Sequence, residues 1–308
     1  DKKKIVFSGV GKTTKEIEFA IKKKIKQLNV ESIEELEEIN SICKGLGNKI
    51  DICIRVNPDI DAETHEKIST GRSEDKFGIS NDKIQDIFKK YKNNKFINII
   101  GLSIHIGSQI ESLNPFKKAF AKIKNQILKL RSQGFAITTI DLGGGMGIKY
   151  NNKNNPFDIK LFARLIEDTF SDLDIEIIIE PGRYLVGSSG IILSKIIRIK
   201  QGAKKNFIII DAGMDNLIRP ALYGAAHKII PIRINNKIEN NFADIVGPIC
   251  ETSDIFIKKV RTQKFKKNDL VAILSTGAYS SCMASNYNLR EPAKEIFIKE
   301  NKINLSNK

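Results

Sequence analysis

Four short clusters of polar residues and glycines follow apolar runs in the first 185 residues, and several of their side chains are of kinds that carry out chemistry. The clusters span residues 57–59, 105–108, 141–145 and 180–183. His105 and Glu180 supply an imidazole and a carboxylate, while the glycines let backbone N–H groups approach an anion without a Cβ in the way. Gly143 to Gly145 and Gly182 therefore predict phosphate-type loops. The alternative is that these glycines lie in ordinary turns.

The apolar runs before the clusters alternate with longer stretches that have helical periodicity. The predicted strands are residues 4–8, 25–30, 50–56, 99–106, 138–142 and 175–179, and the predicted helices are residues 31–46, 82–91, 115–132 and 161–170. This alternation indicates parallel strands joined by helical crossovers. In a (β/α)8 barrel, catalytic side chains gather at the carboxyl ends of the strands, and phosphate binds after the last two. Because a closed barrel has about eight strands and fewer are found here, we expect an incomplete barrel.

The pattern changes after Arg183, where short strands follow one another closely without intervening helices. The predicted strands of this region are residues 191–200, 207–210, 229–234, 243–246 and 270–274. Such spacing is typical of an all-β domain. The sequence therefore predicts a partial α/β barrel domain at residues 1–185 and a C-terminal β domain at residues 186–308.

The composition argues against several classes of protein. The chain has 308 residues, of which 41% are apolar, and this is long enough for two domains with cores. No apolar run approaches the roughly 20 residues that span a bilayer, and no signal peptide is recognisable. The net charge of +15 comes from scattered lysines without interleaved aromatic residues. We therefore expect an intracellular protein that binds neither membrane nor nucleic acid.

The four cysteines, Cys43, Cys53, Cys250 and Cys282, contain no Cys-x-x-Cys pair, and few histidines accompany them. This pattern argues against a zinc site or a disulfide framework, so no metal is expected. It is typical of a reducing compartment, which agrees with a cytoplasmic location. Cys43 and Cys53 lie in helix-like and strand-like surroundings and are interpreted as buried packing residues.

Five motifs follow one another along the chain. They are Ser-Ile-His-Ile-Gly-Ser-Gln at residues 103–109, Asp-Leu-Gly-Gly-Gly at 141–145, Glu-Pro-Gly-Arg at 180–183, Gly-Pro-Ile-Cys-Glu at 247–251 and Gly-Ala-Tyr at 277–279. In this order they resemble the signature of the diaminopimelate decarboxylases, and the resemblance covers nearly the whole chain. It implies an alanine-racemase-like barrel followed by a β domain, with pyridoxal 5'-phosphate as cofactor. The implied reaction converts meso-2,6-diaminopimelate to L-lysine and carbon dioxide, the last step of lysine biosynthesis.

The resemblance also implies roles for the residues around the cofactor. Glu180 resembles the carboxylate that keeps the pyridine nitrogen protonated, so that the ring can accept electrons from the breaking C–C bond. His105 resembles the imidazole that stacks on the ring. Taken alone, His105 would be interpreted as a buried structural histidine, but the Gly-Ser-Gln that follows it favours the stacking role. The remaining cofactor contacts fall by resemblance to Ser108, Gly143, Gly144, Gly145, Gly182, Arg183 and Tyr279.

Substrate recognition is assigned by the same resemblance to Arg183, Arg219, Tyr223, Glu251 and Tyr279. Diaminopimelate is an amino acid at both ends, so its distal carboxylate and distal ammonium must be held during the reaction. Two guanidinium groups offer forked donors to the carboxylate, and a carboxylate can accept from the ammonium. Taken without its neighbours, Arg219 could instead be an ordinary surface ion-pair residue.

Cys250 resembles a thiol that the family delivers across a dimer interface to protonate the carbanion left after carbon dioxide departs. Glu251 follows it and crosses the same interface by resemblance. One subunit would then be incomplete, so the resemblance implies a homodimer with shared active sites.

One motif of the family is missing from this sequence. In relatives, the Schiff-base lysine lies in a Tyr-Ala-x-Lys-Ala-Asn-like motif at the end of the first barrel strand, and no such motif occurs here. We therefore expect a chain that starts near the third strand and has negligible activity when made alone. Lys12, Lys76 and Lys149 lie near strand ends, but none follows the motif, so we do not expect them to replace it.

Three other readings remain. Residues 8–14 follow a strand and open a helix as a P-loop does, but a P-loop requires glycine at the position of Val6. The chain could also be a non-catalytic relative that binds or regulates an active partner. Within the enzyme class, the alternative is a decarboxylase of the same fold that acts on ornithine, arginine or carboxynorspermidine.

Overall fold

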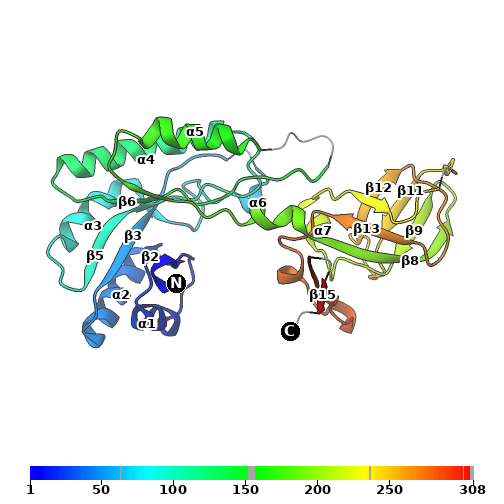
Figure 1. The fold of residues 1–308 in the computed structure, drawn as a ribbon, viewed down its shortest axis with the longest axis horizontal. Coiled ribbons are helices and arrows are strands. Elements are labelled where there is room, and N and C mark those ends of the chain that lie inside the picture. The colour runs from blue at the N-terminus through cyan, green and yellow to red at the C-terminus, as the bar shows by residue number, and fades with distance from the viewer. Residues whose placement is uncertain (63, 152–156, 236, 301, 306–308) are drawn as a thin grey trace. The chain divides into compact units, whose positions relative to one another are not determined.

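The computed structural model describes residues 1–62, 64–151, 157–235, 237–300 and 302–305. The chain divides into two compact units (Figure 1). Unit 1 comprises Asp1–Gly147 and Pro156–Pro181, and unit 2 comprises Ile148–Asn155 and Gly182–Lys308. A short segment before residue 156 thus belongs with the C-terminal part of the chain, and each unit is described by itself below.

Unit 1 is built on parallel strands that follow chain order across the sheet. The order is β1-β2-β3-β5-β6-β7, and a short strand, β4, also pairs with β3. The strands are β1 (Val6–Phe7), β2 (Gln27–Val30), β3 (Ile50–Asn57), β4 (Ile79–Ser80), β5 (Ile97–Ser103), β6 (Thr139–Asp141) and β7 (Glu176–Ile178). The helices are α1 (Thr14–Lys23), α2 (Ile33–Leu46), α3 (Ile84–Tyr91), α4 (Asn114–Ser132) and α5 (Ile159–Phe170). This arrangement confirms the predicted partial α/β barrel.

The sheet of unit 1 is curled, because side chains from strands that are not neighbours touch across its concave side. Asn29 on β2 donates from Nδ2 to Asp141 Oδ2 on β6 at 2.7 Å. At the opposite end of the strands, the Lys26 ammonium lies 2.7 Å from Glu176 at the start of β7. The curl therefore brings the carboxyl ends of distant strands together, as barrel geometry requires.

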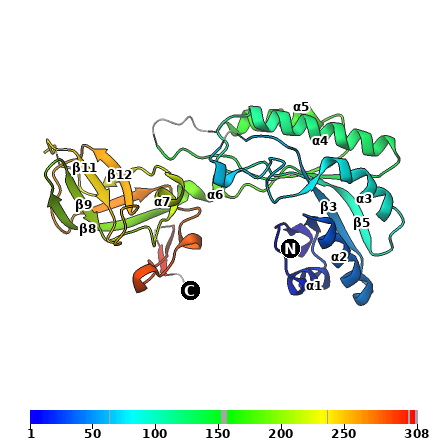
Figure 2. The ribbon, with the colours of Figure 1, turned by 180° about the vertical axis from the view of Figure 1, so that it is seen from behind.

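Helices α4 and α5 lie side by side over the outer face of the sheet in both views (Figures 1 and 2). Phenylalanines seal the contact between them. The Phe116 and Phe162 rings are 5.0 Å apart edge to face, and those of Phe120 and Phe170 are 5.7 Å apart. Such aromatic pairs add to the free energy gained from burying the rings. This packing holds together the two helical crossovers, α4 between β5 and β6 and α5 between β6 and β7.

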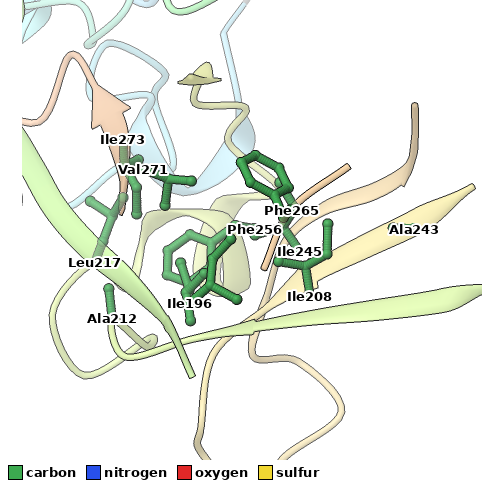
Figure 3. Close-up of a cluster of buried hydrophobic side chains, with 11 residues drawn as sticks. Ile196, Ile208, Ala212, Leu217, Ala243, Ile245, Phe256, Phe265, Val271 and Ile273 are labelled. Carbon is green, nitrogen blue, oxygen red and sulfur yellow. The ribbon is translucent and has the colours of Figure 1, made fainter. Parts of the chain in front are cut away.

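Unit 2 contains a six-stranded sheet in the order β10-β13-β8-β9-β11-β12, in which only β9 and β11 pair in parallel among neighbours. Its strands are β8 (Ile191–Gln201), β9 (Asn206–Ile210), β10 (Ile229–Pro231), β11 (Ala243–Val246), β12 (Ile255–Val260) and β13 (Leu270–Leu274). Two short helices, α6 (Arg183–Val186) and α7 (Arg219–Tyr223), and a separate hairpin, β14 (Ile296–Lys299) with β15 (Lys302–Leu305), complete it. Figure 3 shows Ile196, Ile245 and Phe256, which belong to the buried hydrophobic core of the six-stranded sheet.

Several elements were predicted only in part or not at all. A helix was expected to open after residues 8–14, but the extent of α1 was not predicted, because it buries only Ile17, Ala20 and Ile21 among lysines and glutamates and its apolar stripe is narrow. Strand β12 contains two adjacent lysines, and the β14–β15 hairpin is exposed on both faces, which removes the alternation that marks a half-buried strand. Local composition therefore concealed these elements.

We expect Phe120→Ala to lower the free energy of unfolding by about 3–5 kcal/mol, because it leaves a cavity between α4 and α5. Phe19→Ala is the matched control, since Phe19 is 63% exposed. Urea unfolding followed by circular dichroism measures both variants. Equal effects of the two substitutions would contradict the assigned role of the phenylalanine cluster.

Candidate active site

The carboxylate of Glu180 lies at the centre of a polar network at the carboxyl ends of the strands in unit 1. Ser8, which follows β1, donates from Oγ to Glu180 Oε1 at 2.8 Å. Asn29 Nδ2 donates to Ser8 Oγ at 2.9 Å and to Asp141 Oδ2 at 2.7 Å. Four strands thus contribute to one chain of hydrogen bonds that fixes the direction of the Glu180 carboxylate.

Asp141 is the second carboxyl group of this network and is almost fully buried. Burial, together with the negative charge of neighbouring Glu180, raises the pKa of Asp141 well above its usual range. The Asp141 carboxyl group therefore holds its proton more readily than an ordinary aspartate does.

His105 follows β5 and is held as a neutral imidazole. The backbone N–H of Gly144 donates to His105 Nδ1 at 3.1 Å, so Nδ1 carries a lone pair and the ring proton is on Nε2. Burial, and then the nearby Arg55 guanidinium, lower the pKa of His105 to about 4. An uncharged ring at this position can stack on a flat ligand without opposing its positive charge.

The triglycine turn packs directly against His105 and Glu180. The backbone N–H of Glu180 donates to the carbonyl of Gly143 at 2.8 Å. A Cβ placed on Gly144 would meet the carbonyl oxygen of Glu180 at 2.1 Å. Gly145 has φ +95° and a Cβ there would meet the Gly107 oxygen at 2.3 Å. These glycines are therefore required by the close approach of three strand-end loops, which brings the predicted imidazole, carboxylate and glycine turn to one place.

The other predicted residues of unit 1 lie at the same end of the sheet or near it. Ser108 is partly buried and its backbone N–H donates to the carbonyl of Ile68 at 3.1 Å. Lys12 is buried and pairs with Glu35 at 2.6 Å, so its ammonium is turned away from a phosphate role. Lys76 and Lys149 are exposed. The paired Lys12 ammonium argues against the P-loop reading.

In unit 2, two arginines surround the ring of Tyr150. Arg183 Nη1 donates to the Tyr150 hydroxyl at 2.6 Å, and the Arg219 guanidinium carbon lies 4.3 Å from the ring centroid. Tyr279 packs on the other side of Arg183, at 4.5 Å from its guanidinium carbon. Arg219 Nη1 lies 2.7 Å from His227 Nε2. The predicted residues Arg183, Arg219 and Tyr279 therefore form one cluster with two residues that were not predicted.

Arg219 is 4% exposed, and among the described residues no carboxylate forms an ion pair with it. Its Nε atom is buried without a hydrogen-bond partner. Burial, with the neighbouring charges, lowers the pKa of Arg219 from its ordinary value. A buried cation is costly unless it is paired, and this guanidinium has the charge and an unused donor with which a carboxylate could be bound.

The loop after β11 carries the predicted thiol. Cys250 and Glu251 are exposed, and the buried Asp254 carboxylate orders the loop by accepting from the backbone N–H groups of Ile249 and Met214, both at 2.8 Å. The hydroxyl of Tyr287 is hydrogen-bonded to Glu251, and this raises the pKa of Tyr287. The loop thus holds its thiol and carboxylate at the surface of unit 2.

Tyr223 ends helix α7 four residues after Arg219, and Gly182 is the exposed residue that precedes α6. Sequence reasoning did not single out Ser8, Asn29, Tyr150 or His227. Ser8 directly follows β1, and Asn29 lies near the carboxyl end of β2. Because site residues of a barrel gather at the carboxyl ends of its strands, these positions could have identified both residues from the sequence. Tyr150 and His227 lie outside such strand ends, and only the packing around the arginines reveals them.

Comparison with known proteins defines the class. Residues 1–187 match the family model described as pyridoxal-dependent decarboxylase, pyridoxal binding domain. Diaminopimelate decarboxylase of Zymomonas mobilis is 41% identical over 300 residues, which are 97% of this chain and 71% of that protein. The crystal structure of the Helicobacter pylori enzyme complexed with L-lysine superposes with a TM-score of 0.94 at 40% identity, covering 99% of this chain and 75% of that one. The M. jannaschii enzyme, also with L-lysine, gives 0.92 at 35% identity, covering 99% and 71%.

The fold and the strand-end site are thus those of a pyridoxal-phosphate-dependent decarboxylase. More narrowly, the chain belongs to the diaminopimelate decarboxylase family, the carboxy-lyases that convert meso-2,6-diaminopimelate to L-lysine. The residues present fit the cofactor, because a carboxylate, a neutral imidazole and a glycine turn meet at one end of the sheet. No helix in the described part of the chain has the length and apolar character needed to cross a membrane.

Gly144→Ala is expected to lower the free energy of unfolding by about 1–3 kcal/mol, because the added methyl group collides with the Glu180 backbone. Gly11→Ala is the control: its Cβ would meet nothing within 4 Å. Thermal and urea unfolding compare the two. If Gly144→Ala is as stable as Gly11→Ala, the close packing of the loops is not as described.

The stability of the protein should depend on pH through His227. Burial and the nearby arginines lower its pKa to about 4 in the folded state, against about 6.5 when unfolded. The stabilisation is complete above pH 6.5 and is lost as the pH falls towards 4. In that range His227 binds a proton in the unfolded chain but stays unprotonated in the folded chain. Between pH 7 and 4.5, His227→Gln should lose about 2–3 kcal/mol less than the unmodified chain in urea titrations. Identical losses would show that His227 is not held neutral.

Proposed function

We propose that this chain binds pyridoxal 5'-phosphate with residues of its barrel part and recognises the distal amino-acid end of meso-2,6-diaminopimelate with residues of unit 2. The observation that carries the proposal is the buried Arg219 guanidinium, which has no acidic partner among the described residues and keeps a free Nε donor. A decarboxylase whose substrate lacks a second carboxylate would have no use for such a group. This favours diaminopimelate over ornithine and other amines as the substrate.

In the cofactor site, Glu180 would accept a hydrogen bond from the protonated ring nitrogen, and the neutral imidazole of His105 would stack on the ring. Pyridoxal phosphate supplies, when bound, a conjugated ring that takes up the electron pair of the breaking C–C bond. Ser8 holds Oε1 of Glu180 at 2.8 Å, so the carboxylate keeps one direction. The Glu180 carboxylate would stabilise a protonated ring nitrogen in a low-dielectric interior.

The phosphate group is assigned to Ser108, the turn of Gly143, Gly144 and Gly145, Gly182 and Tyr279. Glycine at these positions exposes backbone N–H groups to an anion. Two N–H groups of the turn are already used inside the protein, because Gly143 donates to Asp141 Oδ1 at 2.9 Å and Gly144 donates to His105 Nδ1 at 3.1 Å. These two glycines therefore orient the imidazole and the Asp141 carboxyl group, and their lack of a Cβ leaves room for the phosphate beside them.

For the substrate, Arg183 and Arg219 are proposed to bind the distal carboxylate, with Tyr223 and Tyr279 at its sides. Arg183 stacks on Tyr279 and donates to Tyr150, so its guanidinium plane is restrained. Glu251 is assigned to the distal ammonium. Holding both charges of the distal end places the near carbon without any contact to the carboxylate that leaves.

Cys250 is the proposed proton donor to the carbon from which carbon dioxide departs, and Glu251 accompanies it. Both lie exposed on a loop fixed by Asp254, as expected for groups delivered to another subunit. We therefore propose a homodimer in which each copy completes the site of the other. Free thiols at Cys43 and Cys53, buried in unit 1, support a location in the cytoplasm.

Arg219→Gln is expected to weaken binding of meso-2,6-diaminopimelate about 10- to 100-fold, since a charge-assisted hydrogen bond contributes roughly 1.5–3 kcal/mol. Arg233→Gln is the control, because Arg233 is an exposed arginine of the same unit. Isothermal titration calorimetry in the presence of pyridoxal phosphate measures both, with L-ornithine as the competing amino acid. Equal affinity for ornithine and diaminopimelate, or an Arg219 variant that binds normally, would contradict the proposed substrate.

A further inference from the structure

We propose that His227 is a positioning residue that gives this site its selectivity for a ligand with a distal carboxylate. It does so by accepting a hydrogen bond from one nitrogen of Arg219 and leaving the forked edge of the guanidinium for the ligand. The inference rests on the proposed function of Arg219 and extends it to His227, which contacts that arginine.

The hydrogen-bond chemistry of the pair allows only one form of the imidazole. A guanidinium group has donors and no acceptor, so His227 Nε2, at 2.7 Å from Arg219 Nη1, must supply the lone pair. The ring proton then lies on Nδ1, which donates to the carbonyl of Leu274 on β13 at 2.9 Å. Geometry alone therefore makes His227 neutral and sets its tautomer.

The contact leaves the correct edge of Arg219 available. Bidentate binding of a carboxylate uses two parallel N–H groups, and Nε with Nη2 form such a fork. His227 occupies Nη1, whereas Nε is buried without a partner. The guanidinium is thus held at Nη1, and its unpaired Nε donor belongs to the edge that His227 does not occupy.

Packing prevents the pair from turning. His227 is 2% exposed, and its ring lies 4.9 Å from the ring of Tyr150, edge to face. The same Tyr150 ring lies 4.3 Å from the Arg219 guanidinium carbon. Arg219 and His227 therefore pack against the same tyrosine ring, so a movement of either side chain would disturb the other.

A neutral partner has a consequence that an acidic one would not have. Aspartate or glutamate at position 227 would pair with Arg219, cancel its charge and compete with the ligand's carboxylate. The charged or titratable groups that face the imidazole are Arg219 from α7, Arg183 from α6 and Tyr150, and the two cations oppose its protonation. His227 thus orients Arg219 while the full positive charge remains for the ligand.

Two substitutions separate the two hydrogen bonds of the imidazole. His227→Gln places an amide where Nε2 was and can still accept from Arg219. His227→Asn places it where Nδ1 was and retains only the bond to Leu274. The probes are L-lysine and 1,5-diaminopentane, which differ by a single carboxylate, and calorimetry on the full chain with pyridoxal phosphate gives the ratio of their dissociation constants.

We expect the preference for L-lysine to fall about tenfold in His227→Asn and to remain within about threefold in His227→Gln, with little change in the affinity for 1,5-diaminopentane. A merely structural histidine would change the stability of both variants and leave the ratio unaltered. A folded His227→Asn chain that keeps the full preference overturns the inference. If that variant does not fold, ¹⁵N NMR of the unmodified chain decides: protonated Nε2 overturns the inference, and unprotonated Nε2 beside the Arg219 resonance supports it.

The proposed function and this inference fail in different ways. If the unmodified chain shows no preference for L-lysine, the assignment of Arg219 to a distal carboxylate is wrong, and the role of His227 falls with it. If the unmodified chain and Arg219→Gln differ as expected but His227→Asn behaves like the unmodified chain, only the role of His227 is wrong.

Discussion

The hydrogen bond from Asn29 to Asp141 connects strands that are not neighbours in the sheet, and the geometry of the cofactor site depends on it. It requires the sheet to curl until β2 and β6 face one another. The same asparagine reaches Ser8, which holds Glu180. The same hydrogen bonds therefore hold the sheet in its curled form and fix the direction of the Glu180 carboxylate. Such a buried network is favourable only when its members are satisfied together.

Each unit contains a neutral imidazole close to a charged group: His105 lies near Glu180 in unit 1, and His227 lies next to Arg219 in unit 2. His105 accepts from a backbone N–H and His227 accepts from a guanidinium, so each ring has a defined tautomer. Burial lowers the pKa of both rings to about 4, which keeps them uncharged at neutral pH. Uncharged rings can orient a group or stack on a ligand without cancelling the charge that the chemistry needs. The Glu180 carboxylate in unit 1 and the Arg219 guanidinium in unit 2 thus each have a neutral imidazole nearby.

The strands that were predicted from the sequence lie within a few residues of their observed bounds. Residues 243–246 and 270–274 agree with β11 and β13, because both are short, mostly buried apolar runs that contain β-branched residues. Strand β12 was missed and only the start of helix α1 was expected, since lysines interrupt their apolar patterns. The glycine turn was correctly placed beside His105 and Glu180, but its packing role, through the Gly144 backbone, is visible only in the folded chain.

The amino-acid sequence by itself determined the alternation of strands and helices, the change to a β region and the family, because these depend on local periodicity and on the order of short motifs. Only the tertiary structure decided which polar groups are buried together. Tyr150 and His227 are 77 residues apart by number and carry no motif, yet their rings pack 4.9 Å apart around the same arginine. Desolvation and charge act through space, so the protonation state of His227 and the unpaired donor of Arg219 follow from the fold and from no stretch of sequence.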